Sequence, residues 1–194
     1  MNQPPPISPT ASYFEILSVP VSADEATLTR RFHELSRLYH PDRWGTADIA
    51  TQTTVLESAA LINDAYRTLR DPFTRAEYLL RRERGTRPDD LKQSAKPPQE
   101  LFAEVLELQE LLMEFQEAQA DDDAETAERL RPQLEEARKT FEQAYTEMAD
   151  RLNAQFERWD AGEDRAAVLD AMSEVIGIRG YLRRVLTNLQ NMLG

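Results

Sequence analysis

The sequence predicts an all-α protein, with an N-terminal helical hairpin, short flanking helices and a C-terminal three-helix antiparallel bundle. Three observations support this fold class. Leu, Glu, Ala and Arg are abundant, which favours helices over strands. Only 6 of the 194 residues are glycine. Apolar residues recur at steps of three and four, as they do on amphipathic helices.

The charge of the chain is unevenly distributed. Residues 1–84 contain 10 Lys and Arg against 11 Asp and Glu, a balance of −1, whereas residues 85–194 contain 13 against 24, a balance of −11. The total of −12 argues against general nucleic-acid binding. Two regions of such different charge are expected to meet different partners.

Several further classes of protein are excluded by composition. No apolar run approaches the length of a membrane span, and the opening MNQPPPISPT lacks the apolar stretch of a signal peptide. We therefore expect a cytoplasmic protein with no membrane contact. The chain has no cysteine, which excludes disulfides, thiolate metal sites and cysteine nucleophiles.

The N-terminal elements follow from capping and periodicity. Residues 1–11 are rich in proline and are expected to form a disordered tail. Ser12 and Glu15 have the spacing of a capping box and open a short helix, SYFEIL. Ser22 and Glu25 have the same spacing, which predicts that Ser22 caps the next helix.

Two longer helices are expected to form the hairpin. The first carries an apolar stripe and must end near His40, because the residue before a proline is disfavoured in the helical region. The second spans about 51–70 and follows the polar loop PDRWGTADIA. Asp71 and Pro72 then cap and start the helix FTRAEYLLRRER. The two stripes are Leu28, Phe32, Leu35 and Tyr39, and Val55, Ala59, Ile62, Tyr66 and Leu69.

The C-terminal half is expected to form the bundle. Residues 85–98, GTRPDDLKQSAKPP, break every periodicity and are predicted to be a linker between a domain at 12–84 and a domain at 99–194. Helices are predicted at about 99–118, 124–159 and 164–193. Pro132 should mark a kink or a late helix start.

The hairpin tip contains His40, Pro41 and Asp42, for which several interpretations are open. The tripeptide could be a chance combination of a surface histidine, a helix stop and a turn former. A metal site is unfavourable, because the other histidine, His33, lies roughly 10 Å away along the helix and is expected to face solvent. A catalytic role lacks a nucleophile motif or a phosphate-binding loop.

A docking role fits the surroundings of the tripeptide better. Proline limits the backbone freedom of the loop, so the histidine and the aspartate are presented in few orientations. Arg30, Arg31 and Arg37 lie off the apolar stripe of the preceding helix, and Arg43 follows the tripeptide. A basic face that ends in a fixed aspartate suits an acidic, hydrogen-bonding protein surface.

The first bundle helix presents a second candidate surface. Its core seam is predicted to be Leu101, Val105, Leu108, Leu112 and Phe115. Phe102 and Leu106 lie off this seam beside several glutamates, and such residues form a plausible binding patch. The alternative is a wider apolar stripe that packs against both neighbouring helices.

Together these motifs resemble a J-domain, the module by which DnaJ-type co-chaperones engage DnaK-type chaperone ATPases. The resemblance is carried by YFEIL, by the basic second helix, by His-Pro-Asp and by INDAYRTLRDP. It implies that the domain has no active site of its own. Instead, it binds the nucleotide-binding domain and the interdomain linker of the chaperone and accelerates ATP hydrolysis by shifting the conformation of its partner.

The segments PFTRAEYLLRRERG and ELFAEVLELQELLMEF further resemble the iron–sulfur co-chaperone family HscB, in its bacterial form without a cysteine-based metal module. This resemblance implies a non-enzymatic protein without a cofactor, whose bundle binds an IscU-type scaffold protein and presents it to a specialised chaperone, HscA. The chaperone-binding residues implied are His40, Pro41, Asp42, Arg31, Arg37 and Arg43. The scaffold-binding residues implied are Phe102, Ala103, Leu106, Glu107, Glu110, Glu114 and Tyr181.

Two other hypotheses remain open. The chain could be a J-domain co-chaperone for a different dedicated client, with the bundle as another adaptor. It could also be a purely structural helical protein in which His-Pro-Asp is inert. The expected difference is that only the structural protein would tolerate replacement of His40 by Gln without any loss of binding.

Overall fold

The computed structural model describes residues 4–85 and 99–193, and all regular structure in these ranges is helical. The all-α prediction is confirmed. The elements are α1 (Tyr13–Leu17), α2 (Glu25–Leu38), the 3₁₀ turn η1 (Pro41–Trp44), α3 (Ile49–Leu69), α4 (Pro72–Arg84), the 3₁₀ turn η2 (Gln99–Leu101), α6 (Phe102–Ala120), α7 (Ala124–Asp160) and α8 (Arg165–Leu193).

Helix starts in the N-terminal half are set by side-chain caps. Ser12 and Glu15 form the predicted capping box: the Glu15 N–H donates to Ser12 Oγ, and the Ser12 N–H donates to the Glu15 carboxylate. The prediction that Ser22 caps α2 is wrong. Asp24 is the cap, because its carboxylate accepts from the N–H of Thr27 at 2.8 Å.

The α2–α3 hairpin has the predicted packing. Leu28 and Tyr39 are buried, and the Phe32 ring stacks on Tyr66 of α3 with centroids 4.2 Å apart. α2 ends at Leu38, close to the predicted stop. α3 begins at Ile49 rather than near residue 51, because Asp48 caps it.

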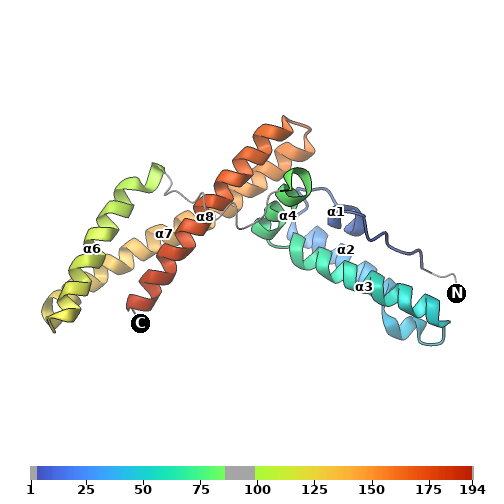
Figure 1. Ribbon diagram of the computed structural model, residues 1–194, viewed down its shortest axis with the longest axis horizontal. Helices are drawn as coiled ribbons and strands as arrows, with labels where there is room; N and C mark the ends of the chain where they lie inside the picture. Colours follow the sequence, from blue (N-terminus) through green and yellow to red (C-terminus); the bar gives the residue numbers. More distant parts are fainter. Residues whose placement is uncertain (1–3, 86–98, 194) are drawn as a thin grey trace.

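Residues 4–11 differ from the disordered tail that we expected over 1–11. Pro4 is buried, and Ile7 packs against the core. The Tyr39 hydroxyl donates to the Pro5 carbonyl oxygen at 2.7 Å, and the Ile7 N–H donates to Ser58 Oγ at 3.5 Å. This segment runs from α1 toward the tip of the hairpin (Figure 1). The composition suggested that the loss of chain entropy on ordering would keep this segment unfolded. Burial and these two hydrogen bonds offset that loss.

The C-terminal half is the predicted up-down-up bundle, in which both α6 and α8 pack against α7 (Figure 1). On α6, Val105, Leu108 and Phe115 of the predicted seam are buried, and Leu101 and Leu112 are half-buried. Pro132 lies inside α7, which starts eight residues earlier at Ala124, so it does not mark a late helix start.

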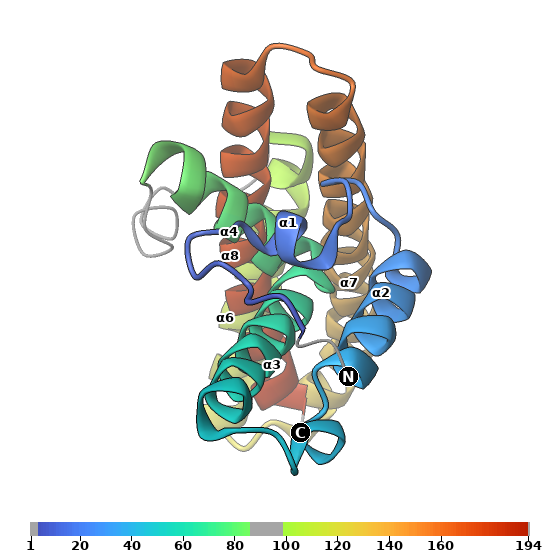
Figure 2. The same cartoon turned by 90° about the vertical axis from the view of Figure 1, so that its right-hand side faces the viewer.

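Helix α4 joins the two halves, because it packs against α3 on one side and against α7 and α8 on the other (Figure 2). The Arg75 guanidinium is buried in this junction and donates to the carbonyl oxygens of Leu69, Val21 and Ala23. Burial lowers the pKa of Arg75 to about 10, which still leaves it charged at neutral pH.

A second junction contact comes from Asp160 at the end of α7. Its carboxylate accepts from the N–H groups of Val21 and Ser22 at 3.2 and 2.7 Å. The contacts of α4 and Asp160 therefore fix the angle between the hairpin and the bundle. The predicted linker beyond Gly85 lies outside the described residues.

Candidate functional site

The tip of the hairpin presents the His-Pro-Asp tripeptide to solvent. His40 is the cap of the η1 turn and Pro41 is its first residue. The main-chain N–H of Asp42 donates to His40 Nδ1 at 3.3 Å, so in the neutral imidazole the hydrogen is on Nε2. The Asp42 side chain is 89% exposed. One imidazole donor and one carboxylate are thus displayed on a proline-stiffened turn.

Two buried aromatic residues flank the tripeptide on either side. Tyr39 is only 3% exposed, and burial raises the pKa of its hydroxyl. Trp44 is also buried, and its indole N–H donates to the Leu38 carbonyl oxygen at 2.9 Å. The exposed tripeptide is therefore held between two anchored rings, and Trp44 was not identified from the sequence as part of this arrangement.

The predicted basic residues are in different environments. Arg37 and Arg43 are exposed beside the tip, and the Arg43 guanidinium donates to the Arg37 carbonyl oxygen at 3.2 Å. Arg31 is half-buried and donates through Nε to the Leu17 carbonyl oxygen at 2.9 Å. Its second nitrogen pairs with Glu34 at 2.6 Å.

Glu34 therefore lies within the basic face and reduces its positive charge. Its other carboxylate oxygen is 4.0 Å from Nε of Arg30. The positive charge that is not compensated in this way lies at the tip, on Arg37 and Arg43. His33 is exposed on the same helix, as expected.

A hollow next to the tip was not foreseen. It has a volume of about 220 Å³, and Pro41 and Asp42 form one of its walls. The opposite wall comes from α3, through Gln52, Val55 and Leu56. Leu56 and Ile49 are exposed on the same helix. The tripeptide therefore borders an apolar surface as well as a charged one.

The second candidate site is one face of α6. Phe102 is 55% exposed and Leu106 is 47% exposed, so these residues do not pack against the neighbouring helices. This excludes the wider apolar stripe. The other predicted members on this helix, Ala103, Glu107, Glu110 and Glu114, are also exposed. α6 thus carries an apolar pair surrounded by carboxylates.

Two members of the predicted set have additional contacts. Glu114 pairs with Arg129 of α7 at 2.6 Å. Tyr181 comes from α8, and its half-buried ring packs against the core, which raises the pKa of its hydroxyl. Its place in a common face with Phe102 and Leu106 stays a prediction.

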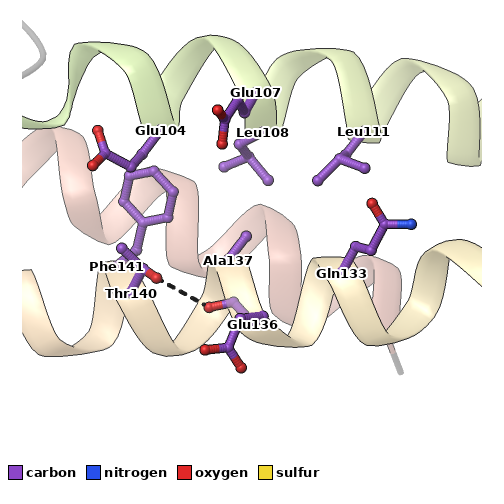
Figure 3. Close-up of a pocket in the computed structure, with 9 residues that line it drawn as sticks. All are labelled: Glu104, Glu107, Leu108, Leu111, Gln133, Glu136, Ala137, Thr140 and Phe141. Atoms are coloured by element: carbon purple, nitrogen blue, oxygen red, sulfur yellow. Dashed lines mark hydrogen bonds between the residues drawn. The ribbon is translucent and has the colours of Figure 1, made fainter.

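A hollow of about 300 Å³ lies between α6 and α7 (Figure 3). The side chains of Leu108 and Leu111 point from α6 toward α7, Phe141 points from α7 toward α6, and Glu104 and Glu107 lie at the α6 edge (Figure 3). Glu107 therefore belongs both to the exposed face and to this hollow. The contribution of α7 could not be found from periodicity, since it depends on which helices meet.

Within residues 4–85 and 99–193, no group of three or more His, Asp or Glu side chains is arranged to hold a metal ion. None of the helices in these ranges is both long and apolar enough to cross a membrane.

Comparison with known proteins supports this description of the fold. Residues 12–78 match the DnaJ domain. The chain is similar to the structure of chaperone HscB from Vibrio cholerae, with a TM-score of 0.55 and 24% identity, over 93% of this chain and 96% of that one. It is also similar to the crystal structure of human co-chaperone protein HscB, with a TM-score of 0.54 and 22% identity, over 96% of this chain and 86% of that one.

The matched residues contain the exposed tripeptide, and the two structural relatives extend the likeness through α6, α7 and α8. Residues 12–78 therefore match a DnaJ domain, and the chain as a whole has the fold seen in the two HscB structures.

Proposed function

We propose that this protein is a co-chaperone in iron–sulfur cluster assembly. Its J-domain stimulates ATP hydrolysis by a DnaK/HscA-type chaperone, while its bundle delivers an IscU-type scaffold protein. One observation carries the proposal: an exposed His-Pro-Asp tip and a separate exposed apolar–acidic face are joined by a packed junction.

The tip supplies the chaperone-binding residues. His40 and Asp42 offer a hydrogen-bond donor and a carboxylate in a geometry that Pro41 limits, so little freedom is lost on binding. Arg37 and Arg43 steer an acidic partner to the tip, with Arg31 at the edge of the same face. None of these residues carries out chemistry, and the ATPase belongs to the partner. The protein acts by favouring one conformation of that partner.

The α6 face supplies the scaffold-binding residues. Phe102 and Leu106 bury apolar area against the scaffold, with the exposed Ala103 beside them. Glu107, Glu110 and Glu114 favour a partner with basic residues around an apolar centre. Tyr181 is proposed as a contributor from α8. The iron–sulfur cluster is cargo held by the scaffold, and this protein needs no cofactor.

The packed junction links the two proposed binding sites within one protein. A scaffold on α6 and a chaperone at the tip are attached to the same protein, so the scaffold is present at a raised local concentration near the chaperone.

The test is steady-state ATP turnover by the cognate DnaK-type chaperone. Turnover is compared after addition of this protein, of the IscU-type scaffold, and of both. Stimulation by both that exceeds the sum, and that is lost in Asp42→Asn, is the expected result. Stimulation that does not depend on the scaffold would support the J-domain function and reject the scaffold as the client.

A different dedicated client is the second candidate. Ala103 offers little apolar area at the centre of the face, and Glu114 is already paired with Arg129. Both features favour a partner with a smaller or less basic contact. Retention of client by the full chain, compared with its Leu106→Ala variant, would identify which protein the face binds.

A further inference from the structure

Residues 4–11, called here the strap, are attached to the helix that presents the tripeptide. Pro4 is buried, Ile7 packs against the core, and the Ile7 N–H reaches Ser58 of α3. The strongest polar contact is the bond from the Tyr39 hydroxyl to the Pro5 carbonyl oxygen, at 2.7 Å. The strap therefore contacts both helices of the hairpin.

Tyr39 is the last residue before the tripeptide. Its main-chain N–H donates to the Leu35 carbonyl oxygen and closes the last turn of α2. Its side chain is buried, and the bond to Pro5 satisfies the phenolic hydroxyl. The direction in which the chain leaves α2 toward His40 is thus set at a residue that the strap holds.

The composition of the strap suits this role. Proline has a fixed φ, so a segment with Pro4, Pro5, Pro6 and Pro9 has few conformations to lose when it packs. Pro5 and Pro6 have no N–H, so in this stretch the main chain offers acceptors. A tyrosine hydroxyl is a suitable donor for such an acceptor.

We propose that the strap is a positioning element for the chaperone-binding tip: by holding Tyr39, it limits the orientations of His40, Pro41 and Asp42. The expected effect of the strap on the chaperone rests on the proposed function. Its expected effect on the loop rests on the geometry of the tip alone. Tyr39 is a positioning residue, since it acts through its neighbour.

Two variants of the full chain remove the contact from opposite sides. Deletion of residues 2–7 removes the acceptor, and Tyr39→Phe removes the donor while keeping the ring. Deletion of residues 2–3 is the control for the first variant. Tyr66→Phe is the control for the second, because it removes a hydroxyl contact with Thr29 in the same hairpin, away from the strap.

The first measurement is amide hydrogen exchange at residues 42–45. Exchange should rise roughly fivefold in both test variants, which is the change that one net hydrogen bond supports, and should stay unchanged in both controls. The second measurement is stimulation of chaperone ATP turnover. The concentration for half-maximal stimulation should rise by a similar factor, with the maximal turnover unchanged.

The outcomes separate this proposal from the proposed function. Unchanged exchange at 42–45 in the two test variants would overturn the strap's role, whatever the ATPase shows. Faster exchange with an unchanged half-maximal concentration would also overturn it. If the unmodified protein stimulates no DnaK-type chaperone, the proposed function fails, and the exchange data alone then support or reject positioning of the loop.

Discussion

The Arg75 guanidinium lies 4.9 Å from the centroid of the Phe156 ring, so a side chain of α4 meets a side chain of α7 at the junction between hairpin and bundle. A cation over an aromatic face is favourable, and more so where water is excluded. The same guanidinium donates to three carbonyl oxygens of the J-domain. One buried charge therefore stabilises both the J-domain and its attachment to the bundle.

Replacement of Arg75 by Met should destabilise the protein strongly. The change leaves the carbonyl oxygens of Leu69, Val21 and Ala23 without their donor in a buried place. We expect a loss on the order of 3 kcal/mol or more in the free energy of unfolding, measured by urea denaturation. Arg82→Met, on the exposed side of the same helix, is the control and should change stability by less than about 1 kcal/mol. Equal losses in both variants would contradict the role given to Arg75.

The Asp160→Ala variant should loosen the junction without unfolding either half. It removes the acceptor for the N–H groups of Val21 and Ser22. The expected cost is about 1–3 kcal/mol. Small-angle scattering should show a broader range of distances between hairpin and bundle. Glu157→Ala, one turn earlier on the same helix and exposed, should leave both readouts unchanged.

Stability should fall with acid because of the helix caps. The pKa values of Asp24 and Asp48 are lowered by hydrogen bonds from Thr27 and Thr51. A folded-state pKa below the unfolded one means that the contribution is complete above the unfolded value near 4 and is lost as pH falls through the folded pKa. Urea midpoints at pH 6 and pH 3 measure this. The difference between them should shrink in Asp24→Asn and Asp48→Asn, which cap without titrating. An undiminished difference would show that other carboxylates cause the acid sensitivity.

Truncation of the exposed apolar pair should separate binding from stability. Leu106→Ala should weaken scaffold binding about tenfold or more, as measured by titration calorimetry, while leaving the thermal midpoint unchanged, since Leu106 is exposed. Leu56→Ala is the matched control, because Leu56 is 57% exposed on α3, outside the bundle.

The buried neighbour Leu108 should behave in the opposite way to Leu106. Leu108→Ala should cost about 2–5 kcal/mol in stability. Scaffold binding that is weakened as much in Leu56→Ala as in Leu106→Ala would contradict the placement of the binding face on α6.

Removal of the negative charge within the basic face should speed chaperone binding. Glu34→Gln releases Arg31 and Arg30 from their carboxylate partner. The association rate with the DnaK-type chaperone should rise roughly two- to fivefold at low salt, and the gain should vanish at high salt. Surface plasmon resonance at two salt concentrations measures it. Glu128→Gln changes the net charge equally, but on the bundle, and a gain of the same size there would rule out a local effect.

Local chemistry made much of the fold predictable. Pro41 ends α2 whatever the tertiary contacts of the helix are. Steps of three and four identify Val105, Leu108 and Phe115 as a core seam without knowledge of the helices they pack against. The exposure of Asp42 at the tip follows from the same helix stop. The choice between two neighbouring candidate caps was harder to predict. Asp24, and not Ser22, caps α2, and its carboxylate accepts from the Thr27 N–H.

Residues whose role depends on tertiary contacts could not be assigned from the sequence. Arg75 resembles the solvent-facing arginines that follow it in α4, and its burial depends on tertiary contacts with Val21, Ala23 and Phe156. Asp160 ends a helix in an acidic region, and nothing local indicates a bond to residues 21 and 22. Pro4 belongs to a composition typical of disorder, yet it is buried, and the carbonyl oxygen of the next residue, Pro5, accepts from the Tyr39 hydroxyl. Whether Phe102 and Leu106 were core or surface required the positions of the neighbouring helices.

Because α7 is one continuous helix, it fixes both the distance between its two ends and their relative rotation about the helix axis. Its 37 residues run for about 55 Å, with Arg131 bonded to Leu193 near one end and Asp160 bonded to the J-domain at the other. Insertion of a single residue between these two points would turn one end by about 100° relative to the other. Insertions of seven residues would nearly preserve the azimuth of α6 while lengthening the helix. Because α8 packs along α7, such a change would need a matching insertion in α8 to keep the contacts between the two helices.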